Sequence, residues 1–306
     1  MGGSAMFFPG LVPTSPTSLQ SFAEGSHHAQ ARLAVADDVL GYPVLSRYAS
    51  ASIYEWEVFE AGYMAVSLAL ADWATERWQL SPAVAGGQSF GAFMAAVFAG
   101  ALTYHDALLL LRRSVTVETD FFDGLPEPLG CHFFYRLSHD QVENLVAEFR
   151  AAGHLLELSV VLDEEVHAVS GPRAALADFA RRVREEGGHP FYTMNRAEHC
   201  SMVAGLRTRL ENEVYGTVRW HRPSIPLLSD VTGALLTTPE EVRTDLLDGW
   251  THPVRWNTVT DGLRAAGVDH VHIVGPRSMF ARITRGRFPT TLITTKTVLT
   301  DSTTAS

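Results

Sequence analysis

The chain has 306 residues, of which 46% are apolar and 19% charged, an ordinary globular composition with enough apolar mass for a full core. Its formal net charge of −10 argues against nonspecific nucleic-acid binding, and it has no apolar run of about 18 residues that would span a membrane. Two cysteines are too few for a disulfide framework and no signal peptide is evident, so we expect a reducing, cytoplasmic compartment.

The first 118 residues are expected to begin a large subdomain. Residues 1–6 have the composition of a leader or an expression scar, and a short buried strand is predicted just after them, at residues 7–10. Apolar residues at helical spacing predict a long, mostly buried helix at residues 56–79. An apolar strand at residues 82–86 leads into a glycine-flanked turn. Two further helices are predicted, at residues 92–100 and 106–117.

Residues 119–192 have a different pattern, which we interpret as an inserted small subdomain. Ser138 is placed to cap a helix, and two neighbouring apolar runs are typical of a hairpin. The predicted elements are a strand at 129–137, a helix at 140–152, strands at 156–162 and 166–171, and a helix at 174–186. This order resembles a ferredoxin-like unit.

Residues 193–306 are expected to return to the large subdomain, which then comprises residues 1–118 and 193–306. Apolar strands are predicted at residues 224–229 and 268–274. Residues 290–306 are rich in threonine and lack periodicity, so we expect them to be loose.

Residues 87–91 read Gly-Gln-Ser-Phe-Gly between a predicted strand and a predicted helix, the setting in which Gly-x-Ser-x-Gly indicates a nucleophile. A serine hydroxyl needs an adjacent base and donors for the developing oxyanion. The glycines permit a strained turn that exposes Ser89, and the helix N-terminus supplies N–H groups, that of Phe90 among them. The motif alone does not exclude a glycine-rich turn without chemistry.

The base must come from elsewhere among 13 histidines. His27 and His28 are expected in a polar loop. His199 lies just after the inserted unit, where the chain returns to the large subdomain. Its position alone favours a structural role. Histidines and acids show no metal-ligand spacing, so no metal site is expected.

The chain resembles the malonyl-CoA:acyl-carrier-protein transacylase and polyketide-synthase acyltransferase family over nearly its whole length. The matching segments are residues 8–10 (Phe-Pro-Gly), 87–91, 169–171 (Val-Ser-Gly), 253–256 (Pro-Val-Arg-Trp) and 274–276 (Val-Gly-Pro), with His199 about 110 residues after the serine. The resemblance implies an α/β fold, with an α/β-hydrolase-like core and a ferredoxin-like insert. It also implies ping-pong transfer, with Ser89 as the acyl carrier and His199 as the base.

The resemblance has further implications for the site. A main-chain carbonyl near Arg255 would orient the histidine. The enzyme would bind no cofactor of its own, because the phosphopantetheine arm belongs to the carrier-protein substrate. The family follows Phe-Pro with Gly-Gln-Gly-x-Gln, whereas Leu11 follows Gly10 here, and its backbone N–H would be the second oxyanion donor. Gln88 replaces the elbow histidine, keeps hydrogen-bonding capacity and is a candidate substrate-binding residue.

Malonyl-selective relatives hold a carboxylate-binding arginine about 25 residues after the serine. An ungapped count places Ser114 at that position. Arg113 lies one residue earlier, and the rotation of about 100° per helical residue should point it elsewhere. A one-residue gap would restore the arginine, and the sequence leaves this alternative open.

Glu198 precedes the histidine in Arg-Ala-Glu-His, where malonyl-selective domains read His-Ala-Phe-His and methylmalonyl-selective ones Tyr-Ala-Ser-His. A carboxylate near the acyl pocket would repel an acyl carboxylate and attract an ammonium, although a solvated, outward-facing glutamate is an equal alternative. Loss of the carboxylate-binding arginine and gain of the Glu198 carboxylate together predict an acyl group without a free carboxylate. Residues 36–48 and 69–74 are similar to discrete acyltransferases of macrolactam polyketide pathways, which favours an aminoacyl or dipeptidyl group.

The leading interpretation is acyl transfer between two acyl carrier proteins in polyketide biosynthesis. A malonyl-type transacylase, a proofreading hydrolase of acyl carrier proteins and an inactive docking module are the alternatives. No nucleic-acid or membrane partner is expected; the oligomeric state stays open, with a monomer expected. Acidic carrier proteins would dock on arginines, which mainly set association rate and orientation. The candidates are Arg150, Arg282, Arg285 and Arg287.

Overall fold

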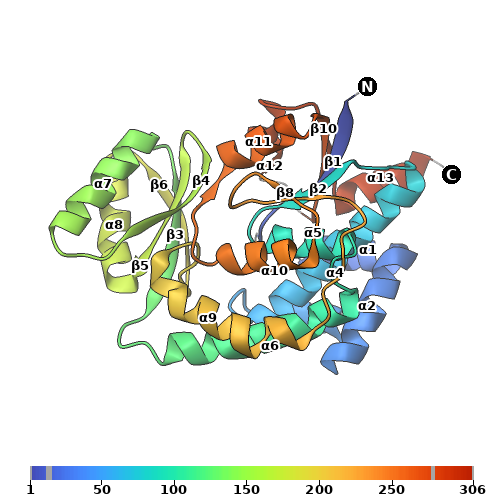
Figure 1. Cartoon of the computed structure of the whole chain (residues 1–306), viewed down its shortest axis with the longest axis horizontal. Helices are drawn as coiled ribbons and strands as arrows, with labels where there is room; N and C mark the ends of the chain where they lie inside the picture. The colour runs from blue at the N-terminus through green and yellow to red at the C-terminus, as the bar shows by residue number, and fades with distance from the viewer. Residues whose placement is uncertain (1, 12–15, 277–279, 305–306) are drawn as a thin grey trace.

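The computed structural model describes residues 2–11, 16–276 and 280–304 and arranges them as a large and a small subdomain (Figure 1). The large subdomain contains strands β1 (Gly3–Phe8), β2 (Val84–Gly87), β7 (Leu227–Leu228), β8 (Leu235–Leu236), β10 (Val268–Val274) and β11 (Thr290–Ile293). Its helices are α1 (Pro16–Gly25), α2 (His27–Leu40), α3 (Val44–Ser50), α4 (Trp56–Arg77), α5 (Phe90–Phe98), α6 (Tyr104–Asp123), α9 (Ala204–Glu213), α10 (Pro239–Asp248), α11 (Trp256–Ala265), α12 (Phe280–Arg285) and α13 (Thr295–Thr304). The predicted α/β class with a small subdomain is confirmed.

The large sheet, in the part of the chain that the structure describes, has the strand order β11-β10-β1-β2-β7-β8. All neighbouring strands are parallel except β7 and β8, which are antiparallel. The β2 strand therefore lies near the centre of the sheet, and its carboxyl end leads directly into α5. This junction is where open parallel sheets place their ligands.

Two sequence predictions about the ends of the chain are wrong. Residues 3–6, set aside as a leader or scar, form the first part of β1, and Ala5 and Met6 are buried between β2 and β10. Residues 290–304, expected to be loose, form β11 and α13. The β-branched threonines of β11 pair in parallel with β10 and extend the sheet by one strand.

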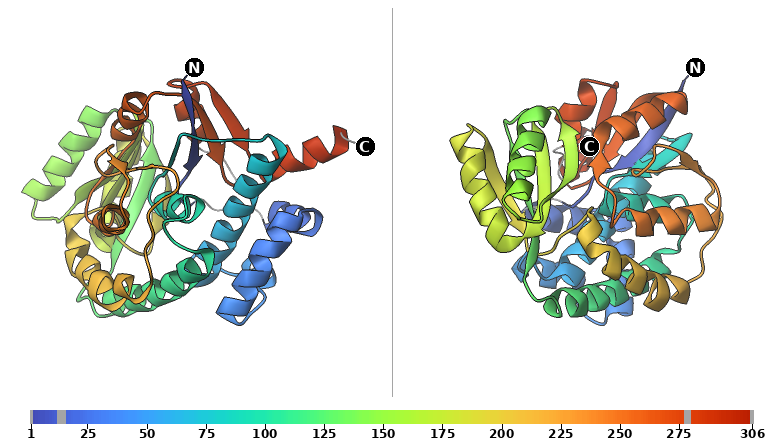
Figure 2. Two further views of the ribbon diagram at one scale, coloured as in Figure 1. Left: turned by 45° about the vertical axis from the view of Figure 1, so that its right-hand side comes forward. Right: turned by 60° about the vertical axis from the view of Figure 1, so that its left-hand side comes forward.

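Helices enclose the large sheet. The α4 helix is buried along most of its length, as the helical spacing of its apolar residues predicted. Figure 2 shows α2 lying beside α4, on the side away from the small subdomain. No helix among the described residues is long and apolar enough to cross a membrane.

The small subdomain contains β3 (Leu129–Tyr135), α7 (His139–Ala151), β4 (Glu157–Asp163), β5 (Val166–Pro172), α8 (Arg173–Glu185) and β6 (His189–Met194). Its sheet has the order β6-β3-β5-β4-β9 within the described residues, and β9 (Val254–Arg255) comes from the large subdomain. Ser138 caps α7 as predicted, whereas β6 was not predicted.

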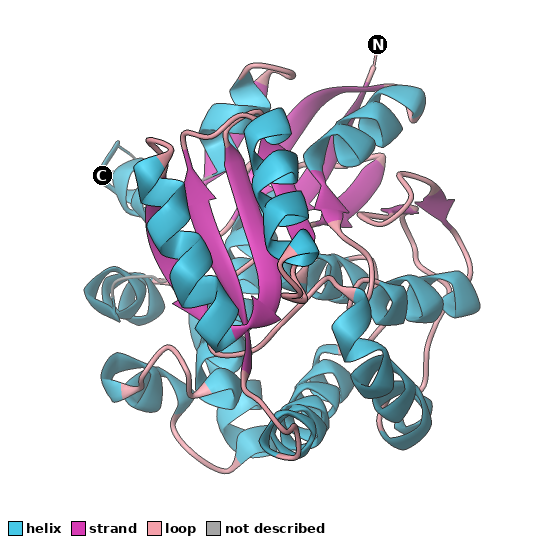
Figure 3. Cartoon of the chain, turned by 90° about the vertical axis from the view of Figure 1, so that its left-hand side faces the viewer, coloured by secondary structure: helices cyan, strands magenta, loops and turns pink. Residues whose placement is uncertain are grey.

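The two faces of the small sheet pack against different parts of the molecule. Figure 3 shows α7 and α8 side by side over the outer face, where Phe134 joins a core with Phe149 and Phe179. The inner face turns toward the large subdomain. Phe133, next to Phe134 and therefore on the opposite face, lines a cavity there.

Candidate active site

Ser89 occupies a strained turn between β2 and α5. Its φ of 56° and ψ of −126° lie outside the ordinary regions for a residue with a side chain. A Cβ on Gly87 would lie 2.0 Å from the backbone of Gly91, and one on Gly91 would lie 1.8 Å from the carbonyl oxygen of Phe8. The two glycines therefore permit the close packing that holds the turn. The Ser89 N–H donates to the Asp230 carboxylate at 2.7 Å.

His199 faces this serine. Its Nε2 lies 2.9 Å from Ser89 Oγ, and its Nδ1 lies 2.6 Å from the carbonyl oxygen of Gly249. A carbonyl only accepts hydrogen bonds, so Nδ1 carries the proton and the Nε2 lone pair is directed at the hydroxyl. The orienting carbonyl was expected near Arg255. It comes instead from Gly249, in the loop after α10.

Burial lowers the pKa of His199, although the nearby Glu198 carboxylate and the Gly249 carbonyl act in the opposite direction. One Glu198 oxygen lies 3.9 Å from Nε2. The ring is therefore held in its neutral, proton-accepting form over a wider pH range than a solvated histidine.

The backbone carrying His199 is held by contacts from the small subdomain. His199 has a φ of 56°, so this segment is strained like the serine turn. From β5, the Ser170 hydroxyl donates to the Glu198 carbonyl at 2.8 Å, and from β4, Glu157 accepts from the Ser201 N–H at 2.9 Å. The small subdomain thus fixes the position of the base.

The predicted oxyanion donors are Leu11, in the loop after β1, and Phe90, the first residue of α5. Leu11 and Phe90 line the same cavity as Ser89. The Gly10 N–H donates to Gln88 Oε1 at 3.3 Å, and the Tyr63 hydroxyl donates to the Gly10 carbonyl at 3.1 Å. Gln88 also lines the cavity, but its amide oxygen supports the loop that carries Leu11. Tyr63 and Gln88 therefore support the loop that carries Leu11.

The cavity at the serine measures about 380 Å³ and lies between the two subdomains. Most of its lining is apolar, yet five carboxyl groups and one guanidinium reach it among the described residues. These charged residues are Glu60, Glu118, Glu198, Asp230, Asp245 and Arg196. Burial, followed by the neighbouring Asp245 carboxyl, raises the pKa of Asp230 to about 7. The cavity is therefore acidic in composition.

Arg196 is the centre of a buried ion-pair cluster. Its guanidinium lies 2.7 Å from Glu60, 2.7 Å from Glu118 and 2.5 Å from Glu198, and it stacks on the Trp56 ring at 3.8 Å. Burial raises the pKa of Glu118 to about 8 and also raises that of Glu60, against the lowering effect of Arg196. One cation is shared by three carboxyl groups, so it has little capacity left for a carboxylate ligand.

Glu198 is not the solvated glutamate that the sequence left as an alternative. It is 8% exposed, lines the cavity and is paired with Arg196. Sequence reasoning missed Glu60, Glu118 and Arg196 as site residues. Glu60, a charged residue just before the apolar run at residues 61–71, was one available signal.

Ser114 faces the cavity from α6. It is 8% exposed, and its hydroxyl has no hydrogen-bond partner among the described residues. Arg113 is exposed, as the helical rotation predicted, and does not line the cavity. Arg112 donates to the Leu40 carbonyl, away from the cavity. Neither arginine replaces a carboxylate-binding residue at Ser114.

Residues 133–194 match the family model described as the VinK acyltransferase small domain. The chain is 25% identical to the Bacillus subtilis malonyl CoA-acyl carrier protein transacylase over 65% of its length and 50% of that protein, and 21% identical to the Escherichia coli K12 enzyme over 92% and 91%. It is 29% identical to erythronolide synthase EryA2 of Saccharopolyspora erythraea over 66% of the chain and 6% of that protein.

Solved structures agree over nearly the whole chain. FabD from Acinetobacter baumannii superposes with a TM-score of 0.86 at 20% identity, covering 99% of this chain and 98% of FabD. A type II polyketide-synthase acyl-carrier protein complexed with its malonyl-transacylase, PlMCAT:AntF, gives 0.85 at 20%, covering 97% and 98%. The chain is an acyltransferase with the FabD fold. The comparisons support the malonyl-transacylase and polyketide-synthase acyltransferase family predicted from the sequence.

Two of the arginines predicted for docking, Arg150 and Arg285, lie on different subdomains of the acyltransferase. Arg150 belongs to α7, on the outer side of the small subdomain, whereas Arg285 ends α12 in the large subdomain (Figure 1). Arg150 donates to the Leu156 carbonyl at 2.6 Å, and Arg287 lies 3.4 Å from the Thr260 hydroxyl. Arg285 is exposed. The side chain of Arg282 lies outside the described residues.

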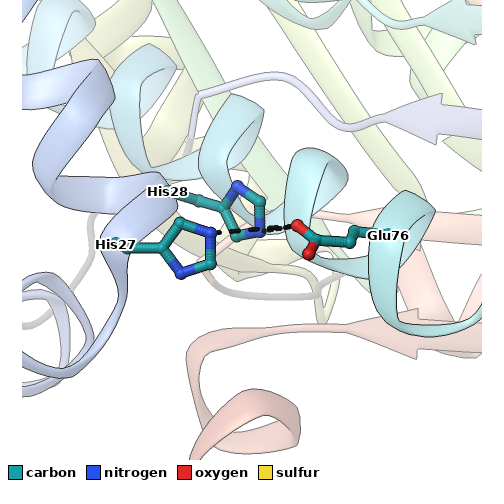
Figure 4. Close-up of side chains that lie close together, drawn as sticks. All are labelled: His27, His28 and Glu76. Atoms are coloured by element: carbon teal, nitrogen blue, oxygen red, sulfur yellow. Dashed lines mark ion pairs between the residues drawn. The ribbon is translucent and has the colours of Figure 1, made fainter.

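Within the described part of the acyltransferase, one surface group has ligand atoms close enough to hold a metal ion. His27 and His28, expected in a loop, begin α2 and point toward Glu76 of α4 (Figure 4). The three ligand atoms lie within 4.8 Å of one another. Glu76 is distant from both histidines along the chain, so residue spacing did not predict this group. None of the three residues lines the cavity.

Proposed function

We propose that this acyltransferase moves an acyl group without a free carboxylate between two acyl carrier proteins, through an ester on Ser89, in polyketide biosynthesis. The observation that carries the proposal is the acidic cavity beside Ser89, whose one arginine among the described residues is already shared by three glutamates. A carboxylate on the acyl chain would be repelled there and would find no unshared cation.

Ser89 and His199 perform the first half of the reaction. The Ser89 Oγ attacks the thioester carbonyl carbon while His199 Nε2 accepts the hydroxyl proton. The backbone N–H groups of Leu11 and Phe90 stabilise the oxyanion. Collapse of the tetrahedral adduct breaks the C–S bond, and the departing phosphopantetheine sulfur takes the proton from His199. The acyl group is now an ester of Ser89.

The second half reverses these steps with another carrier. The thiol of the acceptor phosphopantetheine gives its proton to His199 and attacks the ester carbonyl. The C–O bond then breaks, and Ser89 recovers its proton from the imidazolium. No cofactor bound by the enzyme takes part, because the reactive thiol belongs to the carrier protein. The relative PlMCAT is complexed with a carrier protein, which supports this class of partner.

An aminoacyl or dipeptidyl group is the acyl class that we propose. The similarity of residues 36–48 and 69–74 to discrete macrolactam acyltransferases and the match of residues 133–194 to the VinK small domain support it. An acidic, mostly apolar cavity also suits a chain that carries an amine. The curated relatives named above include malonyl transacylases, so a malonyl group is the competing substrate.

Intact-mass measurement after exposure to acyl thioesters tests this function. We expect Ser89 to gain the mass of neutral acyl and aminoacyl groups from their carrier proteins, and to gain malonyl from malonyl-CoA at least tenfold more slowly. Rapid malonylation of Ser89 would overturn the prediction. Measuring the two products, the free acid and the acylated acceptor carrier protein, distinguishes proofreading hydrolysis from transfer. Transfer predicts the acylated acceptor carrier protein as the main product.

Arg285 is the arginine best placed for carrier docking, because it is exposed and ends α12. We expect Arg285→Glu to lower kcat/KM for carrier-bound acyl groups by about tenfold at low salt, since exposed charges act mainly on association. The rate at which a pantetheine thioester acylates Ser89 should stay within twofold of the wild-type rate. Arg113→Glu, an exposed reversal on α6, is the matched control. Equal loss with both thioesters would contradict docking at Arg285.

A further inference from the structure

Ser114 and Glu118 form a pair on the cavity face of α6. They are four residues apart, so their side chains lie one above the other on the same face of the helix. Both are buried, at 8% and 5% exposure, and both line the cavity that contains Ser89. The Ser114 hydroxyl has no partner among the described residues. A buried hydroxyl without a partner is costly and points to a missing hydrogen-bonding group.

Glu118 is incompletely neutralised in its surroundings. Its Oε2 is bonded to Arg196 at 2.7 Å, and that guanidinium also serves Glu60 and Glu198. One positive charge therefore faces three acidic groups in a buried site. In the free enzyme Glu118 balances the cluster by holding a proton, since burial raises its pKa to about 8, and a second cation would take the place of that proton.

We propose that Ser114 and Glu118 bind the primary ammonium of the acyl chain carried on Ser89, an inference that rests on the proposed function. A primary ammonium has three N–H donors and no acceptor, so it matches a carboxylate and a hydroxyl oxygen side by side. Glu118 gives up its proton to solvent when the ammonium binds and then supplies the negative charge, and Ser114 supplies the second acceptor. The pair then selects for the amine end, while Ser89 and His199 act on the carbonyl end.

Matched thioesters isolate the contribution of the amine. β-Alanyl and butanoyl groups differ only by an ammonium in place of a methyl, as do glycyl-β-alanyl and propanoyl-β-alanyl groups. Acylation of Ser89 from each pantetheine thioester is followed by intact mass, and kcat/KM is compared within each pair. We expect the wild type to prefer the amine in at least one pair. Glu118→Gln should lower that preference about 10- to 100-fold, and Ser114→Ala about threefold to tenfold.

Ser67→Ala is the control. Ser67 is also fully buried with no hydroxyl partner among the described residues, but it lies on α4 and does not line the cavity. Ser67→Ala should leave the ratio of kcat/KM between the amine and methyl members of each pair unchanged. Ser114→Ala removes only an unpaired oxygen, so it tests the proposal even if Glu118→Gln folds poorly.

The outcomes separate this subsite from the proposed function. A wild-type preference for the methyl member of both pairs, or ratios within twofold of wild type in both variants, would overturn the subsite while acyl transfer still stands. Rapid malonylation of Ser89 with no loading of neutral or amine groups would instead overturn the function, and the subsite with it.

Discussion

Replacing Ser89 by alanine is expected to abolish acyl-enzyme formation, and replacing His199 by alanine to slow it by about 10² to 10⁴-fold. The hydroxyl is the attacking atom, and the imidazole 2.9 Å away is placed to accept its proton. The strained turn is held by backbone packing around Gly87 and Gly91, so Ser89→Ala should keep its fold. Single-turnover intact-mass kinetics with a butanoyl thioester measure both effects.

The pH profile distinguishes a base from a merely structural histidine. The pKa of His199 is lowered by burial, so the ring stays neutral as the pH falls through the ordinary histidine range. The acylation rate of the wild type should therefore hold from pH 8 to pH 6.5 and decline only below it. His105→Ala, an exposed histidine at the start of α6, should stay within twofold of wild type. A decline centred above pH 6.5, or an undiminished rate in His199→Ala, would contradict this role.

The serine turn was predictable because its requirements are local. Two glycines, a strand before them and a helix after them lie within a few consecutive residues, and the sequence displays all of these. The role of His199 could not be predicted from local sequence, because the contact between residues 89 and 199 depends on how the insert returns the chain to the large subdomain. The family resemblance supplied what spacing alone does not contain.

The rest of the site depends on tertiary packing. Arg196 meets glutamates from α4 and α6 that are 136 and 78 residues away along the chain. Sequence reasoning considered Glu198 by itself and therefore missed the cation that neutralises it. The carbonyl that orients His199 was sought near Arg255 and lies at Gly249, because a backbone contact has no signature in residue type.

Two missed strands have a similar cause. The β6 strand begins His-Pro and is mostly partly exposed, so its apolar pattern is weak, and pairing with β3 stabilises it. The β11 strand is short and threonine-rich, and it forms by adding to the edge of β10. In both cases pairing with a neighbouring strand completes a structure that the β-branched and aromatic residues favour but are too few to predict.

Arg196→Met is expected to lower the free energy of unfolding by about 3–5 kcal/mol at pH 8, because it leaves buried carboxyl groups without their shared cation. The arginine is 5% exposed and bonds Glu60, Glu118 and Glu198 at once. Urea unfolding at fixed pH measures the change. Arg209→Met, which removes an exposed helical ion pair with Glu213, is the matched control and should change stability far less.

The loss of unfolding free energy in Arg196→Met should be larger at high pH than at low pH. Glu118 has a folded-state pKa of about 8, raised above the value of 4.5 for a solvated glutamate, so the folded state holds a proton that the unfolded state releases between these values. Stability therefore falls as the pH rises through this interval. Without Arg196 the carboxyl groups retain protons still more strongly, so the deficit of Arg196→Met should be smaller at pH 5 than at pH 8. If the loss of unfolding free energy in Arg196→Met did not change with pH, the arginine would contribute packing on Trp56 and not charge. If the variant were as stable as wild type at pH 8, the three glutamates would not need the arginine.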